Sequence, residues 1–555
     1  MIMTGAQILI QALIDQGVDT IFGYPGGAVL NIYDALYDRK DDIRHVTTSH
    51  EQGAAHAADG YARATGKTGV CLATSGPGAT NLVTGIATAY MDSIPMVAIT
   101  GNVPLDLLGR DSFQEIDITG ITIPITKHNF IVKDVNELAE TIKEAFIIAN
   151  SDRPGPVLID IPKDMTSNKT EYVKLEKFEK RPVKLANEES IQKAVNAIRA
   201  AKKPFVYAGG GIVLADACED LVKFATLADA PISASMMGIS AVPYDNPLYM
   251  GMIGMHGTPA SNEASLKCDL LIAIGSRFSD RVACNREKFA PNAKILHIDI
   301  DTSEFSKNIA TDVSIRGDAK DVLTRINKAL PQQNNNEWVT YLQKFKKENT
   351  LNTPPDDGKV HPYDVISQLK EVAGPDAIIV TDVGQHQMFT AQSYPFEKPR
   401  SFLSSCGLGT MGYGFGAAIG AKTAFPDRPV VLITGDGSFH MNMNELACAV
   451  SENLNIVVLI LDNRVLGMVR QWQQLFYKER YSYTSINRKT DFVAMAKAFG
   501  ADGNRIREKS EIRGALKEAL SSKMPYLLDC LTDENENVFP IIPPGKSGED
   551  MIYGE

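Results

Sequence analysis

The sequence has no apolar run that approaches the roughly 18 residues needed to cross a membrane, and no basic leader at its start. The first twenty residues, MIMTGAQILIQALIDQGVDT, space apolar residues such as Ile10, Leu13 and Ile14 at helical intervals. They therefore predict a folded first helix instead of a signal or transit peptide. We expect a cytoplasmic protein without a membrane partner.

Cysteine pairs are also lacking. The seven cysteines are scattered, with no C-x-x-C spacing, which argues against a zinc ribbon or a disulfide framework and predicts free thiols. Basic residues are outnumbered, 56 Lys and Arg against 67 Asp and Glu, so the net charge of −11 argues against nucleic acid as a partner. No short-period repeat is present. These absences leave an enzyme-like globular protein.

What the sequence does contain is an alternation of short apolar strands and helical patterns over 555 residues, too many for one core. This alternation is typical of βαβ units and parallel sheets. Two charged or proline-rich segments without a firm period, 169–190 and 348–362, predict linkers. We expect an α/β fold with three doubly wound parallel-sheet domains and a C-terminal tail, at residues 1–170, 188–335, 360–535 and 536–555.

The strands of this fold are predicted from apolar runs bounded by turn residues. The expected strands lie within 19–24, 43–48, 69–75, 96–101, 155–162, 203–211, 269–276, 293–301, 377–384, 428–437, 455–463 and 525–530.

The segment SHEQGAAHAADGYAR, residues 49–63, predicts a helix of small residues with a carboxylate, Glu51, near its entrance. Small side chains allow another element to approach closely. The carboxylate could cap the helix, bind a metal with His50 and His56, or move protons in a reaction. A zinc site of the H-E-x-x-H type needs a second histidine four residues after the first. That position is Ala54, so the spacing argues against the metal.

Two glycine-rich motifs invite a nucleotide interpretation. GYARATGKT, residues 60–68, resembles a phosphate-binding loop, but it follows a helix where a strand is required, so we reject it. GLGTMG, residues 407–412, satisfies G-x-G-x-x-G and precedes a helical pattern, and Asp436 could be the acidic residue of a dinucleotide fold. An NAD-dependent dehydrogenase is therefore an alternative function.

A different ligand is indicated by the two glycines that flank Asp436. They expose backbone N–H groups at the end of a strand, before a helix predicted to start near Met443, which suits a phosphate and its cation. Asp436 and Asn463 are separated by one helix and one strand, so they should end adjacent strands at one edge of the sheet. With the carbonyl of Val465 they would form a hard-oxygen site for Mg²⁺.

The GDG motif followed by a strand ending in Asn463 resembles the signature of thiamine diphosphate enzymes, with Asp462-Asn463 where Asn-Asn is usual. Beyond that signature, the whole chain resembles the large catalytic subunits of the acetohydroxyacid synthase (acetolactate synthase) family. The stretches that carry this resemblance are FGYPGGAVLNIYDAL, HEQGAAHAADGYARATGK, TSGPGATN, DSFQEIDITG, RPGPVLIDIPKD, GMIGMHGT, IGSRFSDRV, GLGTMGYG and VRQWQQLFY.

The resemblance implies a pyrimidine-binding domain, a central FAD-binding domain and a diphosphate-binding domain. It implies a transferase that decarboxylates pyruvate and joins the remaining unit to pyruvate or 2-ketobutyrate, the first common step of valine, leucine and isoleucine biosynthesis. The active site would lie between the first domain of one subunit and the third of another. A homodimer or homotetramer is therefore implied, and family members often pair with a small regulatory subunit.

The resemblance also assigns residues to cofactors, carried over position by position. For thiamine diphosphate the residues are Tyr24, Gly27, Val383, Gly384, Gln385, His386, Gly409, Met411, Gly435, Asp436, Gly437, Ser438, Asn463, Gly467 and Met468. Asp436, Asn463 and Val465 would hold Mg²⁺. For FAD the residues are Arg153, Gly209, Gly210, Gly211, His256, Gly275, Arg277, Asp280, Arg281, Asp299, Asp318 and Ala319.

Catalytic roles follow from the same resemblance. Glu51 would hydrogen-bond a ring nitrogen of the aminopyrimidine and favour its imino tautomer, and Met411 would wedge the cofactor into a bent shape. Gln114 would donate a hydrogen bond to oxyanionic intermediates. Trp472 would shape the pocket for the second keto acid. Phe113 and Lys127 would line the site.

Two further alternatives remain within this superfamily. One is a flavin-free acetolactate synthase or another carboligase with the same cofactor, against which PGGAVLNIYDAL, DSFQEID and SRFSDRV argue. The other is a non-catalytic paralogue, against which the presence of Glu51, Asp436 and Asn463 argues.

Overall fold

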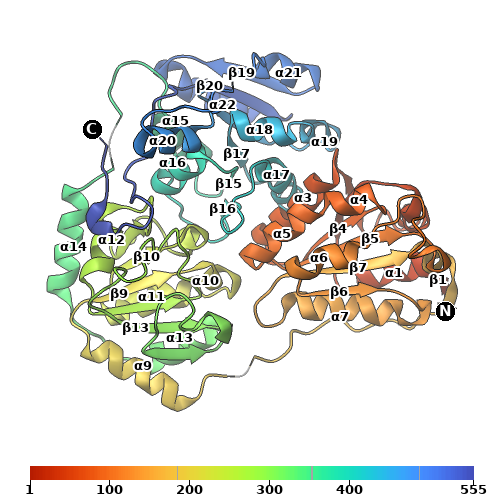
Figure 1. The fold of residues 1–555 in the computed structure, drawn as a ribbon, viewed down its shortest axis with the longest axis horizontal. Coiled ribbons are helices and arrows are strands. Elements are labelled where there is room, and N and C mark those ends of the chain that lie inside the picture. Colours follow the sequence, from red (N-terminus) through yellow and green to blue (C-terminus); the bar gives the residue numbers. More distant parts are fainter. Residues whose placement is uncertain (184, 352–353, 487, 555) are drawn as a thin grey trace.

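Three six-stranded sheets, each with all its strands parallel, form the frame of the molecule (Figure 1). The computed structural model describes residues 1–183, 185–351, 354–486 and 488–554. The expected α/β fold of three parallel-sheet domains is confirmed. Every strand predicted from an apolar run is present, and the strands that the sequence did not predict are mainly short or lie at sheet edges.

The first sheet has the strand order β3-β2-β4-β5-β7-β6. The N-terminal helix is preceded by a short strand that the sequence did not predict, which pairs with the start of the expected linker. The strands are β1 Ile2–Thr4, β2 Thr20–Gly23, β3 Arg44–Thr47, β4 Gly69–Ala73, β5 Met96–Asn102, β6 His128–Ile131, β7 Pro156–Pro162 and β8 Lys169–Glu171. The helices are α1 Gly5–Asp15, α2 Leu30–Tyr37, α3 Glu51–Thr65, α4 Pro77–Asn81, α5 Val83–Asp92, α6 Ile118–Thr122, α7 Leu138–Asn150 and α8 Lys163–Ser167.

The central sheet has the order β11-β10-β9-β12-β13-β14, which is the arrangement typical of dinucleotide-binding sheets. Its strands are β9 Pro204–Ala208, β10 Ile232–Ala234, β11 Tyr249–Met252, β12 Leu270–Ile274, β13 Lys294–Asp299 and β14 Val313–Arg316. Its helices are α9 Glu188–Ala200, α10 Gly210–Leu214, α11 Cys218–Ala228, α12 Pro259–Lys267, α13 Ala319–Ala329 and α14 Asn336–Glu348.

The third sheet, β16-β15-β17-β18-β20-β19, repeats the order of the first sheet when the strands of each are numbered along the chain. Its strands are β15 Ile378–Thr381, β16 Phe402–Leu403, β17 Val430–Gly435, β18 Val457–Asp462, β19 Asp502–Ile506 and β20 Tyr526–Leu531. Its helices are α15 Pro362–Ala373, α16 Gln385–Ser393, α17 Tyr413–Ala424, α18 Asp436–Asn442, α19 Glu445–Ser451, α20 Gly467–Phe476, α21 Phe492–Ala498 and α22 Ile512–Ser521.

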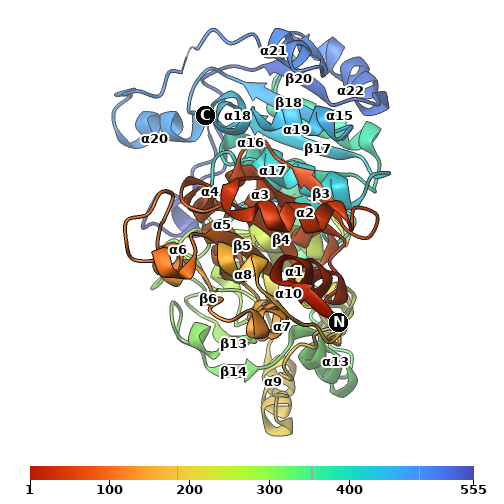
Figure 2. The same cartoon turned by 90° about the vertical axis from the view of Figure 1, so that its right-hand side faces the viewer.

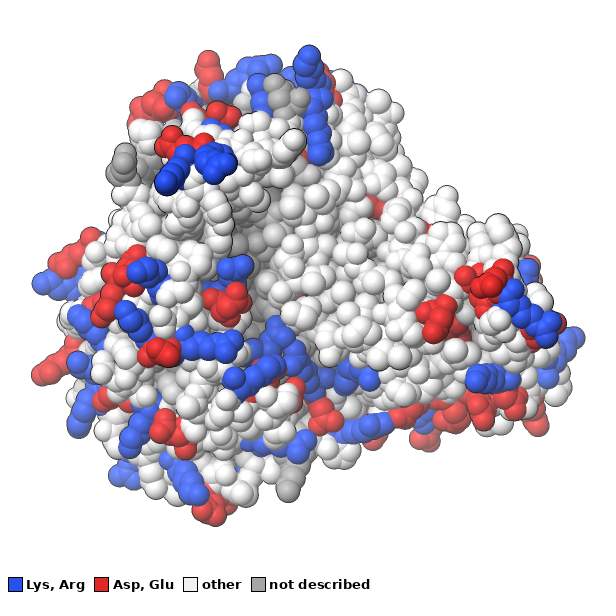
Figure 3. Space-filling model, in the orientation of Figure 1, with Lys and Arg blue, Asp and Glu red and all other residues white. Residues whose placement is uncertain are grey.

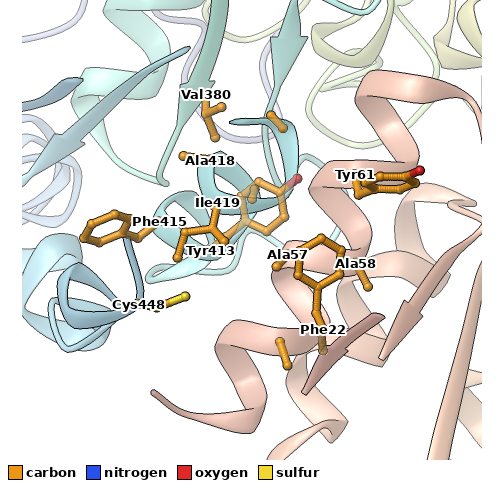
Figure 4. Packing of buried hydrophobic residues seen from close by; sticks show 14 of the residues in the cluster. Phe22, Ala57, Ala58, Tyr61, Val380, Tyr413, Phe415, Ala418, Ile419 and Cys448 are labelled. Atoms are coloured by element: carbon orange, nitrogen blue, oxygen red, sulfur yellow. The ribbon is translucent and has the colours of Figure 1, made fainter. Parts of the chain in front are cut away.

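Helix α3 of the first domain packs against α17 of the third domain (Figures 1 and 2). The four alanines of the predicted small-residue helix are fully buried. They lie in a core that both domains share, where Phe22 and Tyr61 face the side of α17 that carries Tyr413 (Figure 4). The close packing expected of α3 is therefore present, and its partner here is a helix of the same chain.

Glycine makes this approach possible. A Cβ atom at Gly420 would lie 1.9 Å from the carbonyl oxygen of Ala57, and one at Gly60 would lie 2.3 Å from the carbonyl oxygen of Ala417. Neither neighbour can move aside, because each is backbone of a helix. The two helices are thus held at backbone contact.

Gly420→Ala should destabilise the protein by about 1–3 kcal/mol or more, because overpacking at a backbone contact forces the helices apart. Gly514→Ala is the matched control, since its added Cβ would meet nothing within 4 Å in helix α22. That control should be neutral or stabilising by up to about 1 kcal/mol. Chemical denaturation measures both, and equal midpoints for the two variants would contradict the packing argument.

Candidate functional site

One cavity of about 1390 Å³ runs between the central and third domains. Figure 3 shows a hollow between these domains, with lysine and arginine side chains gathered near its lower end. All the residues predicted for the central and third domains line the cavity, together with Arg153 of the first domain. A single cavity of this size exceeds the volume of most small-ligand sites, so it has room for more than one large ligand.

At one end of the cavity lie the carboxyl ends of β15, β17 and β18. β17 pairs with β15 on one side and β18 on the other, so Asp436 and Asn463 follow adjacent strands as the sequence predicted. The strand order reverses between β15 and β17, and ligands of open α/β sheets bind at such a switch point. The helix after β17 begins at Asp436 itself, not near Met443 as expected, because Gly435 is already extended as its N-cap.

Two titratable side chains at this end, those of Asp436 and His386, are buried. Burial, with the nearby charge of Asp462, raises the pKa of Asp436 to about 7. Burial also lowers the pKa of His386 to about 3, and its Nε2 has no hydrogen-bond partner in the described residues. The Ser438 hydroxyl donates to the carbonyl of Val383 at 2.9 Å, which ties the β17 loop to the β15 loop. A bound anion and cation would satisfy these groups.

Asn463 lies beside Asp436 with its amide held in place. Its Nδ2 donates to Oε1 of Gln385 at 3.2 Å, and its Oδ1 accepts the backbone N–H of Val465 at 3.2 Å. Within the described ranges no three His, Cys, Asp or Glu side chains gather as a metal site. A cation here would therefore depend on mixed oxygen ligands from one carboxylate, one amide and backbone, which suits Mg²⁺.

The GLGTMG loop enters the cavity between β16 and α17 and brings Met411 near the GDG turn. A Cβ at Gly437 would lie 3.9 Å from the methyl carbon of Met411. Asp382, whose pKa burial raises to about 6, accepts the Gly412 N–H at 2.7 Å. Asp92 of the first domain accepts the N–H of Gly407 at 2.7 Å. The loop is thus anchored at both ends by buried carboxyl groups.

At the other end of the cavity lie the glycines after β9 and β12. A Cβ at Gly209 would lie 2.0 Å from the carbonyl oxygen of Gly275, so side chains are excluded where the strand order of the central sheet reverses. His256 is buried nearby, both its ring nitrogens lack a side-chain or backbone partner in the described chain, and burial lowers its pKa to about 4. These groups form an open cradle for a ligand.

Charged residues surround that cradle. Arg153 donates to Glu304 at 2.8 Å and to the Ser93 hydroxyl at 2.8 Å. Arg281 lies 6.0 Å from the ring centre of Trp472, which links the central domain to α20 across the cavity. The pKa of Asp299 is raised to about 6 by burial. The remaining predicted residues of this end, Gly210, Gly211, Arg277, Asp280, Asp318 and Ala319, also line the cavity.

Glu51 lies outside the cavity, as do the other residues predicted in the first domain apart from Arg153. Glu51 is half-buried and accepts from Nδ2 of Asn81 at 2.9 Å. It is the first residue of α3, and the cap is provided by the ring nitrogen of His50, which accepts the Gln52 N–H at 3.1 Å. Glu51 therefore does not cap its own helix.

Glu51 lies near the carboxyl end of β4, beside the switch point of the first sheet between β2 and β4. A Cβ at Gly78 would lie 3.2 Å from a Glu51 oxygen and 2.7 Å from the Thr74 methyl group. The Thr74 hydroxyl accepts the Ala28 N–H at 3.3 Å. Tyr24 is 43% exposed, and a Cβ at Gly27 would meet nothing within 4 Å.

The remaining predicted residues of the first domain do not lie together in one pocket. They are Gln114, Phe113 and Lys127. Gln114 adopts a positive φ of 61° and its backbone lies against Gly76, in the loop after β4. Phe113 is 88% exposed. Lys127 donates to the carbonyl oxygens of Ile148 and Ser151 at the end of α7, and burial lowers its pKa to about 8. The structure thus fixes Lys127 to the end of a helix instead of directing it to a pocket.

Sequence reasoning missed Asp92, Asp382 and Glu445. Asp382 directly follows a predicted strand, so its position at the carboxyl edge of a parallel sheet was a usable signal. Asp92 and Glu445 act across the contact between two domains, and nothing in the sequence around them indicates that contact.

Comparisons with known proteins agree with this geometry. The chain matches the family models described as thiamine pyrophosphate enzyme N-terminal TPP binding domain, central domain and C-terminal TPP binding domain, at residues 3–121, 191–326 and 382–530. The probable acetolactate synthase large subunit of Methanocaldococcus jannaschii is 48% identical over 558 residues, 98% of this chain and 94% of that relative. The acetolactate synthase isozyme 2 large subunit of Escherichia coli is 45% identical over 550 residues, 99% of each.

Asp436→Asn should abolish most of the thermal stabilisation that Mg²⁺ with inorganic pyrophosphate gives the protein, weakening binding at least about tenfold, because a neutral amide is a poorer cation ligand. Asp533→Asn is the control, since Asp533 is an exposed carboxylate that also lines this cavity and has no assigned role. The midpoint of thermal unfolding is measured as a function of Mg²⁺ concentration in the presence of pyrophosphate. Equal stabilisation of both variants would refute the assignment of Asp436.

Proposed function

The chain belongs to the acetolactate synthase large-subunit family of thiamine pyrophosphate enzymes, and we propose that it is an acetolactate synthase in branched-chain amino acid biosynthesis. It would decarboxylate pyruvate and join the remaining two-carbon unit to pyruvate or 2-ketobutyrate. The observation that carries this proposal is the end of the cavity where Asp436 and Asn463 follow adjacent strands at a switch point. The dehydrogenase alternative has no support in the family matches.

Thiamine diphosphate with Mg²⁺ fits the groups at this end of the cavity. Asp436, Asn463 and the Val465 carbonyl would hold the cation, and the unpartnered Nε2 of His386 would face the diphosphate. When bound, thiamine diphosphate supplies the electron sink for decarboxylating one 2-keto acid and ligating the product to another. The protein supplies position and charge.

We propose tasks for four of the predicted residues. Met411, held in the GLGTMG loop, would press on the cofactor between its rings, and Trp472 would limit the space for the second keto acid. Glu51 would hold or release a proton at the aminopyrimidine ring nitrogen through its carboxylate. The amide of Gln114 would donate a hydrogen bond to an oxyanion.

FAD is proposed for the other end of the cavity. The strand order of the central sheet is typical of dinucleotide sites, and the contact between Gly209 and Gly275 lies at its switch point. The ring nitrogens of His256 lack partners there among the described residues, and Arg277 and Arg281 are placed to face a diphosphate. The flavin would have a structural role, because the net reaction transfers no electrons.

We further propose at least a homodimer, with each active site shared between two subunits. The support is that Glu51 lies outside the cavity that holds Asp436. A broad face over the first and third domains carries few charged side chains (Figure 3). Next to the GLGTMG loop, Met91, Leu408 and Met441 are 36–54% exposed, and an apolar patch of this kind favours contact with another chain.

A small regulatory subunit is proposed as a further partner. The support is limited to the names of the relatives, which are large subunits of acetolactate synthase and so imply a small one. The location of the protein is addressed by one structural finding, that the described helices include none that is long and apolar enough to span a membrane.

Incubation with pyruvate, thiamine diphosphate and Mg²⁺ should yield acetolactate, identified by mass spectrometry. Glu51→Gln should lower the rate at least about 100-fold, because a positioned proton-transfer group contributes that much, while the amide oxygen of the substituted side chain can still accept from Asn81. The thermal midpoint of this variant should equal that of the unmodified protein. Normal turnover by the variant would refute the proton-transfer role, and no acetolactate from the unmodified protein would refute the function.

Mixed dimers test whether the site is shared. Glu51→Gln and Asp436→Asn each inactivate the protein alone, but a hybrid dimer has one site with both residues intact if the site spans two subunits. Equal amounts of the two variants are mixed, dissociated and allowed to reassociate. Roughly a quarter of the normal activity should return, because half of the dimers are hybrids and one of the two sites in each hybrid is intact. A site contained in one chain would recover none.

A further inference from the structure

A second carboxyl group, that of Glu445, lies at the entrance of α3 and belongs to the third domain. It begins α19 and is completely buried. Its Oε2 accepts the backbone N–H of Ser49 at 3.1 Å, and the His50 N–H also hydrogen-bonds the carboxyl group. The Ser49 hydroxyl donates to the carbonyl of Asn444 at 2.9 Å. Two adjacent backbone groups just before Glu51 are therefore held by one loop of another domain.

The fit of this carboxyl group is close on its other side as well. A Cβ at Gly53 would lie 2.2 Å from Oε1 of Glu445, so only glycine admits the group at this position. Oε1 has no hydrogen-bond partner among the described residues. The side chain therefore lies against the first turn of α3 with one oxygen bonded and the other facing that turn.

The charges around Glu445 come from three elements. Glu51 acts on it from the start of α3, and Cys448 lies one turn along its own helix. Arg44 of β3 pairs with Glu452 at 2.8 Å near the far end of α19. Burial and the charge of Glu51 raise the pKa of Glu445 to about 7, so it is largely neutral below that pH.

We infer that Glu445 is a positioning residue for Glu51, which fixes the backbone at the entrance of α3 from the third domain. This inference rests on the proposed function of Glu51. Ionised, Glu445 would place a second buried negative charge beside Glu51. The position of Glu51 therefore depends on how the first and third domains of one chain pack against each other.

Three variants separate the hydrogen bonds from the charge. Glu445→Gln keeps an accepting oxygen and is neutral at every pH, whereas Glu445→Ala removes both. Glu452→Gln is the matched control, because it removes a carboxylate from the same helix that also bonds the first domain, but at a partly exposed site. Each is compared with the unmodified protein.

Hydrogen exchange needs no cofactor and measures positioning directly. In Glu445→Ala the amides of residues 49–55 should exchange at least about tenfold faster, because the entrance of α3 opens without its acceptor, while Glu445→Gln and Glu452→Gln stay near the unmodified rate. Unchanged exchange in Glu445→Ala would overturn the inference, whether or not acetolactate is formed.

The pH dependence of stability tests the contribution of the neutral Glu445 carboxyl group. A carboxyl whose folded pKa is raised stabilises the fold below its unfolded value of about 4.5, and that contribution is lost as the pH rises through about 7. The thermal midpoint of the unmodified protein should therefore fall relative to Glu445→Gln between about pH 5 and pH 8. The kcat/KM for pyruvate should fall in parallel, by several-fold, in the unmodified protein and in Glu452→Gln. Identical pH profiles for Glu445→Gln and the unmodified protein would overturn the charge argument.

Discussion

The backbone contact between α3 and α17 is the constraint on which the arrangement of the sites depends. Gly60 and Gly420 bring the two helices together until a Cβ would overlap a carbonyl oxygen of the neighbouring helix. This contact sets the first domain against the third at one distance and angle. Because Glu51 begins α3 and the GLGTMG loop leads directly into α17, the same contact fixes the starting points of two predicted functional segments.

Buried polar groups make this contact specific. Arg63 of α3 is bonded to Asp59 at 2.5 Å and to Asp92 at 2.8 Å, and the Tyr413 hydroxyl of α17 donates to Asp59 at 2.7 Å. Asp92 in turn holds the N–H groups of Cys406 and Gly407. Removing any member would leave a buried charge or donor unsatisfied, which costs more than a lost surface interaction. The network therefore favours one register of the two helices.

The candidate ligand sites were predictable where they follow strands of one domain. Strand ends are visible as apolar runs, and the parallel order places Asp436 beside Asn463 and Gly209 beside Gly275 without knowledge of the other domains. Short edge strands such as β16, with two residues, have too few residues to show a period. The start of the helix at Asp436 was missed because glycine and serine in its first turn indicate a loop locally, whereas the helix already begins after the extended N-cap Gly435.

What the sequence could not reveal is contact between domains. The residues Asp92 and Glu445 look like ordinary helix ends in the sequence, and only the docking of α3 on α17 makes them partners of distant backbone groups. The predicted site is also divided within one chain, with Glu51 in the first domain and Asp436 in the third. The first and third sheets share one strand order, and each has its own switch point, but Glu51 near the first switch point does not line the cavity of Asp436.

Buried carboxyl groups in the first and third domains make the stability of the fold depend on pH. Asp160, Asp382, Asp436 and Glu445 are all buried, and burial raises the pKa of each to between about 6 and 7 in a chain of net charge −11. A raised carboxyl pKa means that the fold loses stability as the pH rises through that value. Near neutral pH these carboxyl groups are therefore close to their titration points. Asp436 is the member of this set that lines the cavity. A cation bound beside Asp436 would favour its ionised form, so ligand binding would offset the stability that the fold loses as this group ionises.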